Sequence, residues 1–202
     1  MHITLAQLQK ILPGAGDSAS IFVTALNQAM LRYEVQGPLR AAAFIAQVGH
    51  ESAQLRHLVE RFNYSAPALL ATWPKRFTPQ MATASVGQPS LIAQIAYGNR
   101  LGNVEPGDGF RYCGRGLIQI TGKYNYQACS KALGVDCVAE PELLEIPDYA
   151  ALSAAWFWSE NGLNELADLQ RFEQITRRLN GGVQGQEDRR RLYEAALCTF
   201  CR

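Results

Sequence analysis

The chain has 202 residues, 48% of them hydrophobic, and its 19 basic and 18 acidic residues leave a formal net charge of +1. A chain of this length can bury a real core, so we expect a single domain over residues 1–202 and a monomer. The near-neutral charge gives no footprint for nucleic acid or for stable membrane association. No stretch approaches the roughly 18 apolar residues of a membrane span, and the N-terminus lacks the pattern of a secretory signal.

The N-terminal quarter of the chain is typical of packed helices. Apolar residues recur at helical spacing, Pro13 ends the first run, and Pro38 suits the first turn of a later one. The Ala-rich stretch after Pro38 can pack closely against its neighbours. We therefore expect helices over residues 4–12, 20–35 and 38–52, the last with a deeply buried face.

The next stretch is richer in Thr, Pro and Gly. Ser65 can cap a helix over residues 66–77, and a further helix is expected over residues 90–99. The turn-forming composition between them favours a mobile segment. Residues 66–95 are therefore a candidate small lobe or lid.

Glycine occupies six positions between residues 100 and 126. A phosphate-binding loop is a poor interpretation, because no strand, G-K-[ST] or acidic ribose partner stands at the right offset. Tight turns and short irregular strands beside a substrate cleft fit better. With further helices expected over residues 148–162, 171–182 and 186–197, the chain is predicted to be mainly α with at most a small β-hairpin region.

The five cysteines, Cys113, Cys129, Cys137, Cys198 and Cys201, fit no zinc framework. No strand precedes the C-terminal C-x-x-C and no second ligand pair is near it. Reduced or partly buried thiols are therefore the better interpretation. In an oxidising compartment Cys198 or Cys201 could enter a disulfide, whose pairing the sequence does not define.

The stretch GHESAQLRHLVERFNYS places two glutamates where an apolar helix face ends. A zincin motif fails because Gln54 stands where the second histidine is required, and His57 has no evident third ligand, so no metal is expected. Glu51 and Glu60 can instead form the acid and base pair that hydrolysis of a glycosidic bond requires. The alternative is that both are ordinary surface charges.

Helix geometry constrains this pair. On one unbroken helix, Glu51 and Glu60 would lie about 180° apart around the axis and roughly 13 Å apart along it, too far to share a substrate. The helix must therefore end between Ser52 and Glu60, and the chain must turn. Partial desolvation of Glu51 beside the buried face would then suit a general acid, whereas Glu60, beside Arg61, would stay ionised.

Four motifs follow one another in a characteristic order, namely GHES, ERFNYS, YCGRGLIQITGKYNY and ITRRLNGGVQGQEDR. They closely resemble the family-nineteen glycoside hydrolases, the chitinase-like group that includes bacteriophage endolysins. The resemblance covers residues 38 to 193. It implies a lysozyme-like, two-lobed helical fold with a cleft, and an inverting mechanism, and we expect no cofactor.

The resemblance also implies residue roles. Glu51 matches the general acid, Glu60 the general base that activates water, and Thr121 the hydroxyl residue that holds this water. Among the polar positions, Gln119 and Asn125 match residues that contact N-acetylated sugars. An extended segment would present residues 119 and 121 on one face.

Further positions are candidates for the site. Asn180 and Arg189 match a polar network near the acid and base. His50 either orients Glu51 or satisfies a buried backbone group, and Arg115 is expected to brace the cleft through a carboxylate. Residues that either contact sugar or pack in the core are Asn63, Tyr64, Tyr97 and Tyr112, and Trp156 and Trp158 are expected in the core.

The resemblance leads to a functional expectation. The family cleaves β-1,4 bonds in chitin or in peptidoglycan, and this chain resembles the compact phage-type members. We expect an endolysin without a separate cell-wall-binding domain. It would wait in the host bacterial cytoplasm for holin-dependent release and then cut the N-acetylglucosamine and N-acetylmuramic acid strand of the periplasmic wall. A chitinase, an antibacterial effector and a silent glycan-binding protein are the alternatives.

Overall fold

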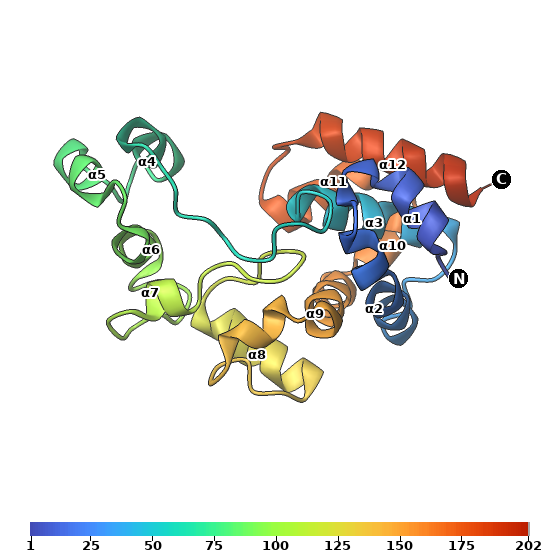
Figure 1. Cartoon of the computed structure of the whole chain (residues 1–202), viewed down its shortest axis with the longest axis horizontal. Helices are drawn as coiled ribbons and strands as arrows, with labels where there is room; N and C mark the ends of the chain where they lie inside the picture. The colour runs from blue at the N-terminus through green and yellow to red at the C-terminus, as the bar shows by residue number, and fades with distance from the viewer. Residues whose placement is uncertain (202) are drawn as a thin grey trace. The chain divides into compact units, whose positions relative to one another are not determined.

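The structure, a computed structural model, describes residues 1–201 and is mainly helical (Figure 1). Within these residues, β structure consists of isolated bridges, so the predicted mainly α fold is confirmed. None of the described helices combines the length and apolar composition needed to cross a bilayer. The α-helices are α1 (Leu5–Ile11), α2 (Ser18–Arg32), α3 (Pro38–Glu51), α4 (Ala66–Thr72), α5 (Pro79–Ser85), α6 (Pro89–Tyr97), α7 (Asp108–Arg111), α8 (Lys123–Leu133), α9 (Pro147–Glu160), α10 (Leu163–Asp168), α11 (Phe172–Asn180) and α12 (Gln186–Phe200).

The chain folds into two compact units. The first contains residues 1–58 and 116–118 and the chain from Leu143 to its described end, and the second contains residues 59–115 and 119–142. Residues 66–95, expected to form a small lobe or lid, supply α4, α5 and most of α6 to the second unit. Their motion as a lid stays a prediction.

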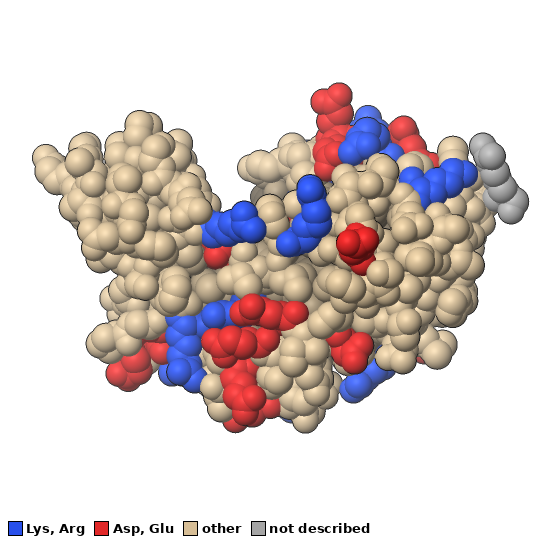
Figure 2. Space-filling model, in the orientation of Figure 1, with Lys and Arg blue, Asp and Glu red and all other residues tan. Residues whose placement is uncertain are grey.

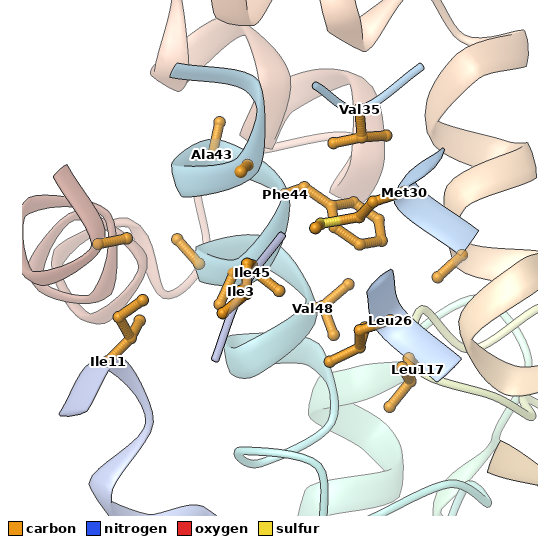
Figure 3. Close-up of a cluster of buried hydrophobic side chains, with 14 of the residues drawn as sticks. Ile3, Ile11, Leu26, Met30, Val35, Ala43, Phe44, Ile45, Val48 and Leu117 are labelled. Carbon is orange, nitrogen blue, oxygen red and sulfur yellow. The ribbon is translucent and has the colours of Figure 1, made fainter. Parts of the chain in front are cut away.

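Helix α3 is the centre of the first unit. Every residue from Ala41 to Gly49 is buried, as the Ala-rich pattern predicted. Phe44 lies beside Met30 in Figure 3 and meets Trp158 edge to face, with ring centroids 5.4 Å apart. At Gly49 a Cβ atom would come within 2.4 Å of Leu12 Cδ2, so the glycine permits a close approach. The buried face fixes α3, and with it the residue at its C-terminal end.

The end of α3 confirms the break predicted between Ser52 and Glu60. The helix ends at Glu51, and Ser52 Oγ donates to the Val48 carbonyl while accepting from the Leu55 amide at 2.8 Å. Residues 53–55 then have positive φ angles, a conformation that costs L-amino acids free energy. The hydrogen bonds of Ser52 and the burial of Leu55, which is 2% exposed, offset this cost.

The surface of the first unit is charged but mixed in sign. On the face drawn in Figure 2, acidic and basic side chains lie next to one another over α11 and α12. Arg177 pairs with Glu173 at 2.9 Å, and Arg191 pairs with Asp188 at 2.7 Å. Exposed pairs of this kind contribute little to stability, so the fold of the first unit does not depend on them.

The second unit has its own aromatic core. Phe62 and Phe77 are buried in it, and Trp73 packs edge to face against Tyr97 with ring centroids 6.2 Å apart. Helix α4 is shorter than the predicted range of residues 66–77, because Pro74 disfavours a helical conformation at the preceding residue. The sequence also missed α8, whose buried residues, Tyr126, Cys129 and Leu133, are spaced among polar ones.

A substitution at Gly122, which precedes α8, can test how tightly the second unit is packed. Its φ is 88°, and a Cβ atom there would lie 2.3 Å from Leu101 Cβ. We expect Gly122→Ala to lower the free energy of unfolding by about 3 kcal/mol, from backbone strain and overpacking together. The matched control is Gly87→Ala, because φ is 76° there and no atom lies within 4 Å, so only about 1 kcal/mol of strain is expected. Urea denaturation followed by circular dichroism measures both, and equal losses would contradict the packing argument.

Candidate functional site

Glu51, the last residue of α3, is held by a buried arginine. Its side chain is 22% exposed, and its Oε1 accepts a hydrogen bond from Nη2 of Arg189 on α12, a side chain that is 2% exposed. The expected partial burial of Glu51 is therefore confirmed. The nearest partner of the carboxylate is the Arg189 guanidinium, which agrees with the polar network near the acid that the motif resemblance implied for Arg189.

Arg189 belongs to a buried polar relay. Its Nη1 donates to Gln47 Oε1, and its Nε donates to the Gln184 carbonyl at 3.1 Å. Gln47 lies one turn before Glu51 on α3, is fully buried, and donates to Thr176 Oγ1 on α11 at 2.8 Å. Three helices therefore fix the guanidinium that holds Glu51. The sequence analysis missed Gln47, although a glutamine inside an apolar helix face signals a buried polar contact.

His50 has a different partner from either of those expected. Its Nδ1 lies 2.7 Å from Oδ2 of Asp188, so the predicted contacts with Glu51 or with a buried backbone group are wrong. Hydrogen bonds from Arg191 and His50 hold the pKa of the Asp188 carboxyl below its usual value. The contact ties the last turn of α3 to the first turn of α12. Asn180, exposed at the end of α11, donates to Gln184 Oε1 at 3.3 Å.

Glu60, in the second unit, is held by neutral donors. Its Oε1 accepts from the Tyr97 hydroxyl at 2.7 Å, and its Oε2 accepts from the Gly114 amide at 3.1 Å. Burial raises the pKa of the Glu60 carboxyl, although the hydrogen bonds from Tyr97 and Gly114 act to lower it. Arg61, the expected neighbour, has an exposed side chain, and burial rather than Arg61 is the main cause of the shift in the Glu60 pKa.

Gly114 lies next to three of the candidate site residues, Glu60, Gln119 and Thr121. Its carbonyl accepts from the Glu60 amide at 2.8 Å, in addition to the bond that its own amide donates to the Glu60 carboxylate. A Cβ atom at Gly114 would lie 2.8 Å from Gln119 Oε1 and 3.2 Å from Thr121 Oγ1. Glu60, Gln119 and Thr121 therefore converge on Gly114, where a Cβ atom would require the Gln119 side chain to shift.

Gln119 and Thr121 reach Gly114 by a turn. The extended segment predicted for them is wrong, because Gln119 has a φ of 58°. The flanking residues Arg115 and Ile120 form an isolated antiparallel bridge, and Thr121 Oγ1 donates to the Gln119 carbonyl at 2.9 Å. Asn125, an exposed residue on α8, donates to the Thr121 carbonyl at 2.7 Å.

Arg115 and Tyr126 brace the backbone around Gly114. Arg115 Nη1 donates to the Arg111 carbonyl at 2.7 Å, and its Nη2 lies 3.7 Å from Oε1 of Glu142, a carboxylate partner of the expected kind. Its role in bracing a cleft stays a prediction. The Tyr126 hydroxyl donates to the Cys113 carbonyl at 2.7 Å. The two chain neighbours of Gly114, Cys113 and Arg115, are thus each held by hydrogen bonds.

The aromatic candidates divide between core and surface. Tyr112 is 3% exposed, and its hydroxyl donates to the Val138 carbonyl at 3.3 Å, so it takes the packing role rather than an open sugar contact. Trp158 is buried as expected, whereas Trp156 is half-buried. Asn63 is exposed, and Tyr64 packs against Trp73 with ring centroids 5.0 Å apart.

The structure thus supplies two sets of polar groups, one in each unit. Glu51 forms the first with Arg189 and Gln47. Glu60 forms the second with the following residues: Tyr97, Gly114, Gln119, Thr121 and Asn125. Within residues 1–201, no group of three His, Cys, Asp or Glu side chains could hold a metal ion. Carboxylates are among the side chains that transfer protons in catalysis.

The hydrogen bond from Tyr97 can be tested through the titration of Glu60. We expect Tyr97→Phe to raise the Glu60 pKa further, because the variant removes a donor to the charged form and leaves the burial in place. Carboxyl-carbon NMR over a pH series measures the pKa directly. Tyr124→Phe is the matched control, since Tyr124 is an exposed tyrosine of the same unit. An unchanged or lowered Glu60 pKa in Tyr97→Phe would contradict this geometry.

The buried relay predicts unequal costs for two arginines of the first unit. Arg189→Ala leaves Gln47 and Glu51 without their donor, so we expect the free energy of unfolding to fall by at least about 2 kcal/mol. Arg177→Ala removes only an exposed pair with Glu173 and should cost less than about 0.5 kcal/mol. Chemical denaturation of both variants measures these free energies of unfolding. A similar small loss of stability in both variants would contradict the proposed relay.

Comparisons with known proteins give matches to one enzyme family. The family model described as chitinase class I, of glycoside hydrolase family 19, matches residues 36–167. A glycosyl hydrolase family 19 domain-containing protein of Haemophilus influenzae is 43% identical over 164 residues, which are 80% of this chain and 80% of that protein. Endochitinase 1 of Theobroma cacao is 31% identical over 71% of this chain.

The extent of these matches differs. The chain spans only 38% of the length of the cacao enzyme. Among solved structures, a bacterial family 19 chitinase superposes with a TM-score of 0.67 and 23% identity, covering 98% of this chain and 94% of that one. At this identity the superposition speaks for the fold, and it agrees with the lysozyme-like helical architecture predicted from the motifs.

Proposed function

Because the chain belongs to glycoside hydrolase family 19, a chitinase-like family, we propose that it hydrolyses β-1,4 bonds in the glycan strands of bacterial peptidoglycan. The observation that carries the proposal is the setting of Glu60. This carboxylate is partly buried and is held by the Tyr97 hydroxyl and the Gly114 amide beside Thr121. A hydrolase needs a base oriented in this way to activate water.

The proposed mechanism divides acid and base work between the two glutamates. Glu51, in its protonated form, gives its proton to the leaving glycosidic oxygen, and Glu60 takes a proton from the attacking water. The hydroxyl of Thr121 holds that water. Because water attacks directly from the face opposite the leaving group, the product is inverted to the α-anomer. Arg189 then stabilises the Glu51 carboxylate that proton donation leaves behind.

The raised pKa of Glu60 has a functional consequence. A carboxylate with a higher pKa is a stronger base, provided that the pH keeps it ionised. The rate should therefore fall on the acid side as Glu60 becomes protonated, at a pH above that of an ordinary glutamate. Tyr97 and Gly114 keep this raised pKa from rising further.

Charge along the chain supports peptidoglycan as the substrate. Arg56 and Arg61 are exposed in the segment that leads to and follows Glu60. Peptidoglycan carries carboxylates on its peptide stems, whereas chitin is neutral, so cationic side chains favour the former. The exposed amides of Asn63, Asn125 and Asn180, together with Gln119, are proposed to contact the N-acetyl and hydroxyl groups of the sugars.

The proposed biological setting is lysis by a bacteriophage endolysin. The enzyme would accumulate in the host bacterial cytoplasm, pass a holin lesion and attack the periplasmic wall, which would cause cytolysis. The bacterial relative supports a bacterial setting, because it is more similar and more completely matched than the cacao enzyme. An antibacterial effector that degrades peptidoglycan would use the same chemistry.

Chitin hydrolysis is the second candidate function. The observation that favours it is the likeness to solved and curated chitinases. Both polymers contain β-1,4-linked N-acetylglucosamine, so the acid and base assignments are the same for either. The substrates differ in charge and in the lactyl ether on alternate sugars of peptidoglycan.

The deciding assay compares two substrates across the wild type, two glutamate variants and one control variant. Wild type, Glu51→Gln and Glu60→Gln are given purified Gram-negative peptidoglycan and, separately, chitin oligomers. We expect wild-type turnover of peptidoglycan, with kcat about 100-fold or more lower in each variant because acid or base catalysis is lost. Glu173→Gln, an exposed glutamate of the first unit, is the control and should keep full activity. Proton NMR of fresh product should detect the α-anomer first.

Each outcome has a distinct meaning. Full activity in Glu51→Gln and Glu60→Gln would refute the acid and base assignment. Turnover of chitin alone would keep the hydrolase and replace peptidoglycan by the second candidate. A first-formed β-anomer would rule out inversion.

A further inference from the structure

The segment of residues 61–104, which holds α4, α5 and α6, is positively charged although the whole chain is nearly neutral. Its basic residues are Arg61, Lys75, Arg76 and Arg100, and it contains no Asp or Glu, whereas the chain as a whole has 19 basic and 18 acidic residues. Among the described residues, no carboxylate pairs with Lys75 or Arg76. Unpaired cations gathered in one part of a chain attract anionic partners to that part.

Lys75 and Arg76 line a surface pocket that lies entirely within the second unit. The pocket has a volume of about 370 Å³, and its lining also includes Met81 of α5 and Gln94 and Ile95 of α6. Lys75 and Arg76 supply positive charge, and Met81 and Ile95 supply apolar surface. The pocket can therefore hold a group that is anionic and has short aliphatic parts beside it.

Arg76 is oriented by the end of α6. Its Nε donates to the Ile95 carbonyl at 2.8 Å, and its Nη2 donates to the Gly98 carbonyl at 2.7 Å. These two bonds fix one edge of the guanidinium, and within residues 1–201 no group accepts a hydrogen bond from its Nη1. A guanidinium that is held in this way and still has N–H groups to donate suits a carboxylate.

The other carbonyls at the end of α6 already have donors. The Ala96 carbonyl accepts from Arg100 Nη1 at 3.2 Å, and the Tyr97 carbonyl accepts from Asn103 Nδ2 at 3.0 Å. Free carbonyls at a helix C-terminus would favour a cation. Because these carbonyls are occupied, the end of α6 does not compete with the positive side chains, and an anion is the better ligand.

The side chain of Gln94 places a further donor at the pocket. Its Oε1 accepts from the amides of Gly107 and Gly109, at 3.1 and 3.2 Å, which leaves Nε2 to face the other way. Nε2 lies 2.6 Å from the position that a Cβ atom would take at Gly98, which also lines the pocket. Since the Gly98 carbonyl binds Arg76, the amide nitrogen and the guanidinium approach the same residue.

We propose that this pocket binds a carboxylate of the peptide stems that peptidoglycan carries. Lys75, Arg76 and the Gln94 amide hold the carboxylate, and Met81 and Ile95 contact the short aliphatic side chains of the peptide. The inference rests on the proposed function, because it names a part of the same substrate that lies outside the glycan strand.

A stem bound beside α6 would hold the polymer on the unit that carries the proposed base. The Tyr97 hydroxyl, from the same helix, donates to Glu60. Because the polymer carries many stems, one that is remote from the bond being cut can occupy the pocket. Such binding adds affinity for peptidoglycan without taking part in bond cleavage, and chitin, which has no stems, gains nothing from it.

Solution NMR with a soluble probe tests the proposal on the full-length chain. The probe is a stem tetrapeptide as the free acid, and the control ligand is the same peptide with every carboxylate amidated. We expect the free acid to shift the backbone amide signals of Gly98 and Asn99 and the side-chain amide signals of Gln94, and the amidated peptide to shift none of them. Added sodium chloride should weaken the binding, because it screens exposed charges.

Two variants alter the pocket while keeping the bonds that hold α6. Lys75→Ala removes an exposed ammonium, and we expect the Kd of the free acid to rise about 3-fold. Gln94→Glu keeps an oxygen for the amides of Gly107 and Gly109 but brings a like charge to the carboxylate, and we expect the Kd to rise about 10-fold or more. The matched control is Lys131→Ala, an exposed lysine of α8 outside the pocket, which should keep the wild-type Kd.

The proposal fails on any of four results. These are no shift of the named signals by the free acid, equal binding of the amidated peptide, an unchanged Kd in both pocket variants, and equally tight binding of inorganic phosphate, which would make the pocket an unselective anion site. The comparison of the two peptides needs no variant. Since binding is measured without turnover, a chain that hydrolyses peptidoglycan but does not bind the peptide here would keep the proposed function and lose only the stem pocket.

Discussion

The paired hydrogen bonds between Glu60 and Gly114 are the constraint on which the second unit depends. One bond joins the Glu60 amide to the Gly114 carbonyl, and the other joins the Gly114 amide to the Glu60 carboxylate. The space where a side chain would stand at Gly114 is taken by Gln119 and Thr121. Arg115 and Tyr126 then hold the flanking backbone. The Glu60 carboxylate, the Gln119 side chain and the Thr121 hydroxyl thus all lie against one residue, Gly114.

The two glutamates are held by opposite chemistry. Glu51 meets a guanidinium, whereas Glu60 meets a phenol and an amide, which donate hydrogen bonds without bringing a charge. Neutral donors offset the burial of Glu60 only in part, and its pKa therefore stays raised. Position next to an apolar helix face led us to assign desolvation to Glu51. At Glu60 burial raises the pKa, because packing of the aromatic core around Tyr97, rather than neighbours in sequence, excludes water there.

The features that depend on contacts between near neighbours in the chain could be predicted from the sequence. The mainly α fold, the buried face of α3 and its end before Glu60 follow from helical spacing and from the reach of a helix, and all are confirmed. Helix α8 was missed because its buried residues are few and lie among polar ones. The hydrogen-bond partners of the two glutamates could not be predicted from local pattern, because they are distant in sequence. Arg189 is 138 residues from Glu51, and Tyr97 is 37 residues from Glu60. Only the motif resemblance pointed to Arg189.

The buried relay of Thr176, Gln47 and Arg189 shows why such partners escape local reasoning. An apolar core would tolerate leucine at position 47 more readily than glutamine, since burying an amide costs free energy unless its hydrogen bonds are made. Gln47 makes them at both ends, donating to Thr176 and accepting from Arg189. The relay therefore adds little net stability while fixing the guanidinium in one orientation. Gln47 and Thr176 therefore act through Arg189, which holds the Glu51 carboxylate. Glu51 is the member of the relay that carries a carboxylate, and its side chain is still 22% exposed to solvent.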